Sequence, residues 1–166
     1  MKSAPDAEVG AFVGLGSNLD DPARQIQRAL GQIESVPDVK IVAVSSLYRS
    51  APFGEVEQPD FVNAVAHLQT SLDAESLLRL LLNIESAQGR VRGERWGPRI
   101  IDLDLLVHGD TTSSTGTLEL PHPGIAERNF VLLPLQEIAP GFVIPGLGKV
   151  ADIAVDRSEP EISRME

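Results

Sequence analysis

The sequence has no cysteine, few aromatic residues and a shortage of positive charge. The absence of cysteine excludes a disulfide scaffold, a thiol nucleophile and a thiolate zinc site, and it suits a reducing, cytoplasmic setting. Lysine and arginine number 14 against 24 aspartate and glutamate residues, which gives a formal net charge of −10. General nucleic-acid binders and anionic-membrane binders need a basic surface, so the composition argues against both classes of partner.

Long apolar segments are also missing. No apolar run reaches the ~20 residues of a membrane-spanning helix, and residues 1–9 lack the apolar core of a signal peptide. We therefore expect a soluble, cytoplasmic protein. The length of 166 residues suits one catalytic domain over residues 1–166, and the polar ends predict loose tails at residues 1–8 and 157–166.

Hydrophobic patterning predicts four strands and two helices in the order β-α-β-β-α-β, which is the ferredoxin-like pattern. This is an α+β fold, with an antiparallel sheet, both helices on one face and C-terminal additions. Asp20 or Asp21 should cap the first helix. We expect loops on the other face of the sheet, and a site there. The expected strands are 10–15, 39–47, 61–69 and 100–107, and the expected helices are 22–37 and 73–88, with short ones at 130–138 and 149–155.

Positive charge is concentrated in residues 89–99, which hold Arg90, Arg92, Arg95 and Arg99. The planar fork of arginine suits phosphate oxygens. Glycines and a proline in this segment are typical of a mobile loop that closes over a ligand. An exposed Trp96 is energetically unfavourable in such a loop unless its ring packs over a ligand or another surface. A solvated connection between a helix and a strand is the alternative interpretation.

Asp102 and Asp104 follow this segment and are two positions apart in an expected strand. Strand side chains alternate, so both carboxylates share one face, roughly 7 Å apart. Such a pair repels on a partly buried face unless a cation lies between its members. Mg²⁺ favours one or two carboxylates together with substrate phosphates, so the pair beside the arginines predicts a polyphosphate site. Two acids on a wetted strand face is the alternative.

Two weaker features each allow a functional and a structural interpretation from the residues alone. His122 lies between two prolines, where a phosphate-oxygen donor and a structural turn histidine fit equally well. Phe61 and Asn63 share a strand face, where a ring and an amide suit a flat heterocycle or pack at a sheet edge. The glycine-rich segment 14–18 lacks the spacing of a dinucleotide-binding or P-loop fingerprint.

These segments together resemble the 6-hydroxymethyl-7,8-dihydropterin pyrophosphokinase family of folate biosynthesis. The resemblance runs from about residue 10 to residue 140, and the arginine-tryptophan segment with the two aspartates is its most specific part. The matching stretches are Gly14–Leu19, Ser46–Pro52, Gln58–Ala64, Glu85–Arg92, Arg95–Arg99 with Ile101–Asp104, and Leu120–Pro123 with Arg128–Phe130.

The resemblance implies an enzyme that transfers the β,γ-pyrophosphoryl group of ATP to the hydroxymethyl group of the pterin and releases AMP. It implies two Mg²⁺ ions held by Asp102 and Asp104, and it is compatible with contacts to neighbouring folate-pathway enzymes. The residues that it implies are Arg90 and Arg99 on the transferring phosphates; Glu85, Arg92, Trp96, His122 and Arg128 on the nucleotide side, with Arg92 and Trp96 in a lid; and Ser50, Ala51, Phe53, Phe61, Asn63 and Phe130 around the pterin, with Phe61 and Phe130 as the stacking rings.

The sequence departs from the family pattern in three places. Phe61 stands where many members have tyrosine, which keeps the ring and loses a hydroxyl; the lid between Arg92 and Arg95 is short; and residues 117–119 lack a basic residue that some members carry. Two other classes share parts of the pattern: a Mg²⁺-dependent phosphohydrolase or nucleotidyltransferase, and a non-catalytic ferredoxin-like binding module. The products of the reaction distinguish the first class from a pyrophosphokinase. The second class includes RNA-binding sheets, and an aromatic content of 4% argues against one.

Overall fold

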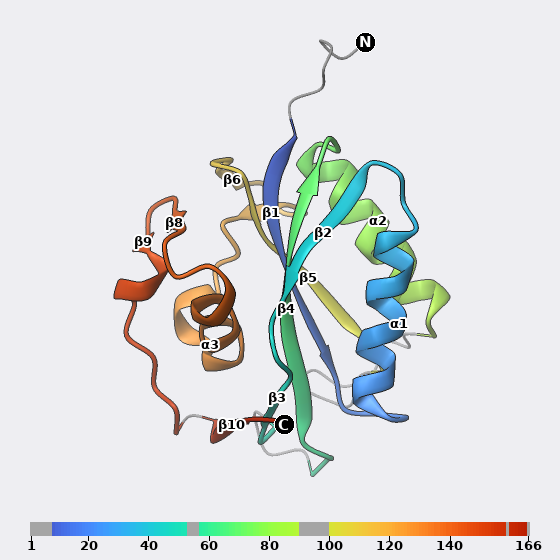
Figure 1. The fold of residues 1–166 in the computed structure, drawn as a ribbon, viewed down its shortest axis with the longest axis vertical. Coiled ribbons are helices and arrows are strands. Elements are labelled where there is room, and N and C mark those ends of the chain that lie inside the picture. The colour runs from blue at the N-terminus through green and yellow to red at the C-terminus, as the bar shows by residue number, and fades with distance from the viewer. Residues whose placement is uncertain (1–7, 53–56, 90–99, 159, 166) are drawn as a thin grey trace.

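The chain folds around one large sheet with helices on both faces (Figure 1). The computed structural model describes residues 8–52, 57–89, 100–158 and 160–165. Its helices are α1 (Pro22–Glu34), α2 (Ala74–Ala87) and α3 (Asn129–Ile138), with short 3₁₀ turns at Ile125–Glu127 and Val150–Asp152. Its strands are β1 (Val9–Ser17), β2 (Val39–Val44), β3 (Tyr48–Ser50), β4 (Phe61–Thr70), β5 (Asp102–His108), β6 (Ser113–Ser114), β7 (Glu119–Leu120), β8 (Val143–Ile144), β9 (Gly148–Lys149) and β10 (Ile162–Arg164).

The large sheet has the ferredoxin-like arrangement that the sequence predicts. β1 pairs with β4 on one side and with β5 on the other, while β2 and β3 pair with successive parts of β4. Each of these pairs is antiparallel. β10 extends the sheet beyond β3, and β5 ends it on the opposite side. The predicted α+β class is therefore confirmed.

α1 and α2 lie together on one face of the sheet, as predicted (Figure 1). The two-residue period of β1 and β4 directs alternate apolar side chains toward these helices. α2 begins after Asp73, whose carboxylate accepts a hydrogen bond of 2.8 Å from the N–H of Ser76. The shared core holds α2 against β5, and β5 carries the two predicted metal ligands.

α3 covers part of the opposite face, which corrects the expectation that only loops lie there (Figure 1). Its apolar side chains pack with Phe12, Val65 and Leu106 of the sheet in a second buried core. The sequence predicts this helix but not its position, because a short apolar segment does not specify the surface on which it packs. The first turn of α3 therefore lies beside the face that carries Asp102 and Asp104.

The predicted cap of α1 is wrong. Asp21 adopts a left-handed conformation with φ 63° and makes no side-chain hydrogen bond to the helix. Its carbonyl instead accepts the N–H of Gln25, and the Gln25 side chain donates to the carbonyl of Asp20. Within the described residues, no helix has both the length and the apolar character that a bilayer crossing requires.

The C-terminal expectations are also corrected. Within the segment that the sequence predicts as a loose tail, Ile162–Arg164 form β10 and pair with β3. Three residues are too few to show a strand period in a sequence, so the pairing depends on contacts that only the folded chain supplies. The helix expected at residues 149–155 is only a short 3₁₀ turn, Val150–Asp152.

Candidate active site

Asp102 and Asp104 lie on one face of β5, as the strand period predicts. β1 runs antiparallel beside them, with Gly16 opposite Asp102 and Gly14 opposite Asp104. Neither glycine has a side chain, so β1 itself places only backbone opposite the two carboxylates. Both aspartates are partly exposed and therefore accessible to a ligand.

Glu85 fixes the strand between the two carboxylates. Its side chain is buried, with 3% exposure, and Oε2 accepts a hydrogen bond of 2.6 Å from the backbone N–H of Leu103. The side chain of Leu103 belongs to the core on the helix side. Glu85 therefore orients its strand neighbours Asp102 and Asp104 through the backbone.

Arg128 connects the start of α3 to the carboxylates. Its Nη1 lies 3.7 Å from Oδ2 of Asp104, and the two side chains are 29% and 34% exposed, so solvent screening keeps this ion pair weak. The guanidinium carbon lies 6.0 Å from the centroid of the Phe130 ring. A Cβ at Gly124 would lie 2.7 Å from Nε of Arg128, so glycine there leaves room for the arginine.

His122 has a defined tautomer. Its Nδ1 lies 3.0 Å from the backbone nitrogen of Gly124. A backbone amide only donates, so Nδ1 accepts and the neutral ring carries its proton on Nε2. Burial, and then the charge of Arg128, lower the pKa of His122 from its ordinary value of 6.5. The ring is therefore a neutral hydrogen-bond donor at physiological pH.

A cavity of about 260 Å³ opens beside the carboxylates. Asp102, Asp104 and His122 line it together with Glu85 of α2 and residues 116–119, which lead into β7. Residues 117–119 bring the acidic Glu119 and no basic side chain to this wall. A polyphosphate in this cavity would therefore need its arginines from other parts of the chain.

Asn63 lies across β1 from Asp102. The strand registers place Asp102, Gly16 and Asn63 in one row across β5, β1 and β4. Nδ2 of Asn63 donates to the carbonyl of Leu15 at 3.4 Å, while Oδ1 is buried and has no hydrogen-bond partner among the described residues. A buried acceptor without a donor is costly, so this oxygen is suited to a ligand that carries N–H groups.

The two predicted stacking rings come from different elements and are both partly buried. Phe61 begins β4 on the same face as Asn63, and Phe130 lies in the first turn of α3. Ser50 is buried and pairs in register with Phe61. The N–H of Ala51 donates to the carbonyl of Glu161 at 3.1 Å, so this amide is already engaged by the C-terminal segment.

Part of the predicted site lies outside the described residues. This applies to Phe53 on the pterin side, and to the arginine-rich segment. The residues of that segment are Arg90, Arg92, Trp96 and Arg99. Their assigned roles stay predictions.

The sequence analysis assigned no role to Asn18 or Asn129, and the structure shows that both are buried amides near the site. Asn18 donates to Oε1 of Gln58 at 2.8 Å and to the carbonyl of Pro59 at 3.0 Å, which joins the end of β1 to the segment before β4. Asn18 directly follows an apolar strand and a Gly-Ser pair, and this pattern could have identified it from the sequence as a residue that anchors a loop. Asn129 donates to carbonyls 27 and 31 residues away, for which no local pattern exists.

The chain is similar to pterin pyrophosphokinases in sequence and to one of their solved structures in fold. The model of a family described as 7,8-dihydro-6-hydroxymethylpterin-pyrophosphokinase (HPPK) matches residues 12–140. A protein of Methylorubrum extorquens named 2-amino-4-hydroxy-6-hydroxymethyldihydropteridine pyrophosphokinase is 42% identical over 155 residues, covering 90% of this chain and 98% of the relative. A protein of the same name from Pseudomonas aeruginosa is 48% identical over 134 residues, covering 81% and 83%.

The crystal structure of Plasmodium falciparum HPPK-DHPS, wild type with pteroate, superposes with a TM-score of 0.71. The match covers 91% of this chain and 42% of that chain. The sequence identity is 16%, so this likeness concerns the fold alone.

Proposed function

The chain belongs to the 7,8-dihydro-6-hydroxymethylpterin-pyrophosphokinase family, and on that premise we propose how its own residues serve the reaction. The enzyme transfers pyrophosphate from ATP, its co-substrate, to 6-hydroxymethyl-7,8-dihydropterin in folate biosynthesis. AMP and the pterin diphosphate are therefore the products. The row across β5, β1 and β4 supports the assignment of residues, because it has the carboxylate of Asp102 at one end and the buried acceptor of Asn63 at the other.

Asp102 and Asp104 are the proposed Mg²⁺ ligands, for the two ions that the resemblance implies. Among the described parts of the chain, no three or more His, Asp or Glu side chains are grouped to hold a metal. A pair of carboxylates fits Mg²⁺, which usually completes its shell with phosphate oxygens and water. When bound, the ions neutralise phosphate charge and orient the reacting groups. Tight metal binding should consequently require ATP.

The pterin is proposed to stack between Phe61 and Phe130. Its flat ring offers two apolar faces to the aromatic side chains and several N–H donors along one edge. Oδ1 of Asn63 lacks a donor among the described residues, and a pterin edge supplies one. Gly16 leaves the space beside the Asn63 amide clear of side chains.

His122 and Arg128 are the proposed contacts to ATP phosphate oxygens on the described part of the site. Nε2 of His122 donates without adding a permanent charge, because the ring is neutral. Arg128 is only weakly paired with Asp104 and can exchange that carboxylate for phosphate oxygens. Both residues flank the cavity or its aspartates, as a nucleotide site requires.

Positioning and charge neutralisation supply the catalysis on this proposal, with no covalent intermediate. The hydroxyl oxygen of the pterin attacks the β-phosphorus, the bond from that phosphorus to the α,β-bridging oxygen breaks, AMP leaves, and the hydroxyl proton passes to solvent. By resemblance, Arg90 and Arg99 stabilise charge on the transferring oxygens. Closure of the segment that holds Arg92 and Trp96 would exclude water and so prevent wasteful hydrolysis of ATP.

We further propose that residues 1–166 act as a single catalytic domain that contacts another enzyme of folate biosynthesis. The P. falciparum structure is titled HPPK-DHPS, and this chain matches 42% of it. That relative thus carries a substantial further part on the same chain, which supports an association between neighbouring activities.

Phosphorus NMR of a completed reaction with ATP, Mg²⁺ and the pterin tests the transfer. We expect one AMP for each pterin consumed, together with a pterin diphosphate. Formation of ADP would indicate attack at the γ-phosphorus, as in an ordinary kinase. Free phosphate with unmodified pterin would indicate a hydrolase.

A further inference from the structure

The C-terminal strap, defined as residues 156–158 and 160–165, contacts one wall of the proposed pterin slot through β3 (Figure 1). β10 pairs antiparallel with β3, with Ile162 opposite Ser50. The carbonyl of Glu161 accepts the N–H of Ala51 at 3.1 Å. The strap therefore holds the backbone of Ser50 and Ala51, which the resemblance places at the pterin edge.

The same strap is tied to the other wall through Asn129. This side chain is 3% exposed, and its Nδ2 donates to the carbonyls of Asp156 and Pro160 at 2.7 Å each. Asn129 directly precedes Phe130, the proposed stacking ring of α3. One buried amide thus links the strap to the backbone that carries this ring.

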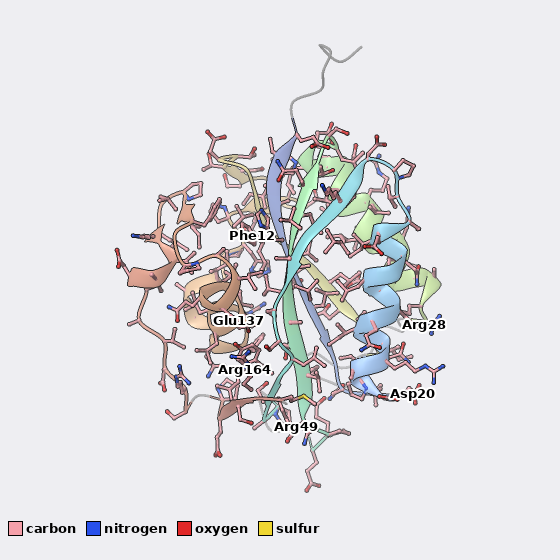
Figure 2. All side chains as sticks on the ribbon, in the orientation of Figure 1. Phe12, Asp20, Arg28, Arg49, Glu137 and Arg164 are labelled. Carbon is pink, nitrogen blue, oxygen red and sulfur yellow. The ribbon has the colours of Figure 1, made fainter. Side chains whose placement is uncertain are left out.

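Polar contacts, rather than close packing, hold the strap at its centre. A cavity of about 330 Å³ separates it from α3, with Tyr48, Glu137 and Arg164 among the residues that line it. Nη2 of Arg164 lies 3.8 Å from Oε2 of Glu137, and both side chains lie between α3 and β10 (Figure 2). The hydroxyl of Tyr48 donates to Oε1 of Glu137 at 2.7 Å. Met165 packs against the main core at the end of the strap, but at the cavity the packing is incomplete and the hydrogen bonds of the strap contribute more to its position.

We propose that the C-terminal strap sets the distance between two parts of the pterin slot, the backbone of Ser50 and Ala51 and the ring of Phe130. Asn129 is then a positioning residue for pterin binding. Asn129 acts through the strap and through its neighbour Phe130. The proposal rests on the pterin slot of the proposed function. It predicts that loosening the strap weakens pterin binding selectively, because among the described residues no backbone hydrogen bond joins the strap to β5 or to His122.

Asn129→Ala and Gln136→Ala form a matched pair for the test. Gln136 also lies on α3, and its Nε2 donates to the carbonyls of Val150 at 3.2 Å and Ile153 at 2.9 Å. Both variants therefore remove one amide that ties α3 to two backbone carbonyls, but only Asn129 holds the strap. We expect Asn129→Ala to raise the KM for pterin about tenfold, as the loss of two hydrogen bonds allows. The kcat and the KM for ATP should change less than about twofold, and Gln136→Ala should leave the KM for pterin unchanged.

A chain that ends at Pro160 is the second variant, because it removes β10 and leaves Asn129 in place. It should show the same selective rise, and circular dichroism checks that each variant folds. Where Asn129→Ala does not fold, the shortened chain decides. An unchanged KM for pterin, an equal rise for pterin and ATP, or an equal rise in Gln136→Ala would overturn the proposal.

Hydrogen exchange separates failure of this proposal from failure of the proposed function. If the wild-type enzyme releases no AMP from ATP in the presence of the pterin, the proposed function is overturned. The strap is then judged from the amide of Ala51, whose acceptor is the carbonyl of Glu161. Faster exchange of this amide in Asn129→Ala than in Gln136→Ala supports the strap, and equal exchange overturns it.

Discussion

Replacing Gly16 with alanine should weaken pterin binding, because the new methyl group would displace the amide of Asn63. A Cβ at Gly16 would lie 2.5 Å from Nδ2 of Asn63, far inside normal contact. The amide cannot move without losing its contact with the carbonyl of Leu15, which it meets at 3.4 Å. Oδ1 of Asn63 would move with it, away from the proposed pterin edge.

Gly14 provides a matched control on the same strand and the same face. The three atoms nearest to a Cβ there all belong to the side chain of Leu106, at 3.6 Å or more, which is ordinary contact. Neither glycine has a positive φ, so alanine fits the backbone at both positions. Gly14→Ala should raise the free energy of unfolding by about 0.5–1 kcal/mol by restricting the unfolded chain. Gly16→Ala should lose this gain to overpacking, which costs about 1–3 kcal/mol.

Calorimetry with a pterin and a non-hydrolysable ATP analogue measures the effect on binding. We expect Gly16→Ala to lower pterin affinity by about 10- to 100-fold, the scale of a lost buried hydrogen bond, and Gly14→Ala to change it little. Combining Gly16→Ala with Asn63→Ala should add nothing to Asn63→Ala alone, since both act on one amide. Unchanged affinity in Gly16→Ala, or an equal loss in Gly14→Ala, would refute the role of Asn63.

Three further predictions concern the metal, the stacking ring and the single tyrosine. Asp102→Asn or Asp104→Asn should lower turnover by about a hundredfold or more without changing the urea midpoint, because each removes a proposed metal ligand rather than a core group; near-normal turnover would contradict the metal assignment. Phe130→Ala should weaken pterin binding by about 1–3 kcal/mol, and an equal loss of ATP affinity in calorimetry would assign the ring to the nucleotide. Tyr48 is the only tyrosine, so absorbance titration should give its pKa at about 12, raised by burial and then by its hydrogen bond to Glu137. Because that pKa is raised on folding, its stabilising effect is present below pH ~10 and is lost as the pH rises toward 12; Glu137→Gln should lower the titration midpoint, and an unchanged midpoint would be evidence against this cause.

Periodic elements could be predicted from the sequence because their signal is local. β4 alternates over ten residues, and the alternation correctly separates the helix-side core from the face that carries Asn63. The same rule places Asp102 and Asp104 together. α1 has Ile26, Ala29 and Ile33 at helical spacing, and all three are buried.

The features that escaped prediction depend on partners distant in the chain or on backbone geometry. β10 has three residues and pairs with β3, and the partners Ile162 and Ser50 are 112 residues apart in the sequence. Asp21 has a suitable side chain for a cap, but its left-handed backbone directs that side chain elsewhere. Glu85 is part of a recognised stretch, yet its partner is the backbone N–H of Leu103, which no residue pattern encodes.

The position of β5 at the end of the sheet also bears on aggregation. A terminal strand presents backbone groups that can pair with a strand of another molecule. On β5, the N–H of Leu103 is taken by Glu85, and the carbonyl of Leu106 accepts the N–H of His122 at 2.8 Å. The contacts that orient the aspartates and hold His122 beside them thus also block intermolecular strand addition. Loss of Glu85 would expose an edge amide, and aggregation would then accompany any loss of activity.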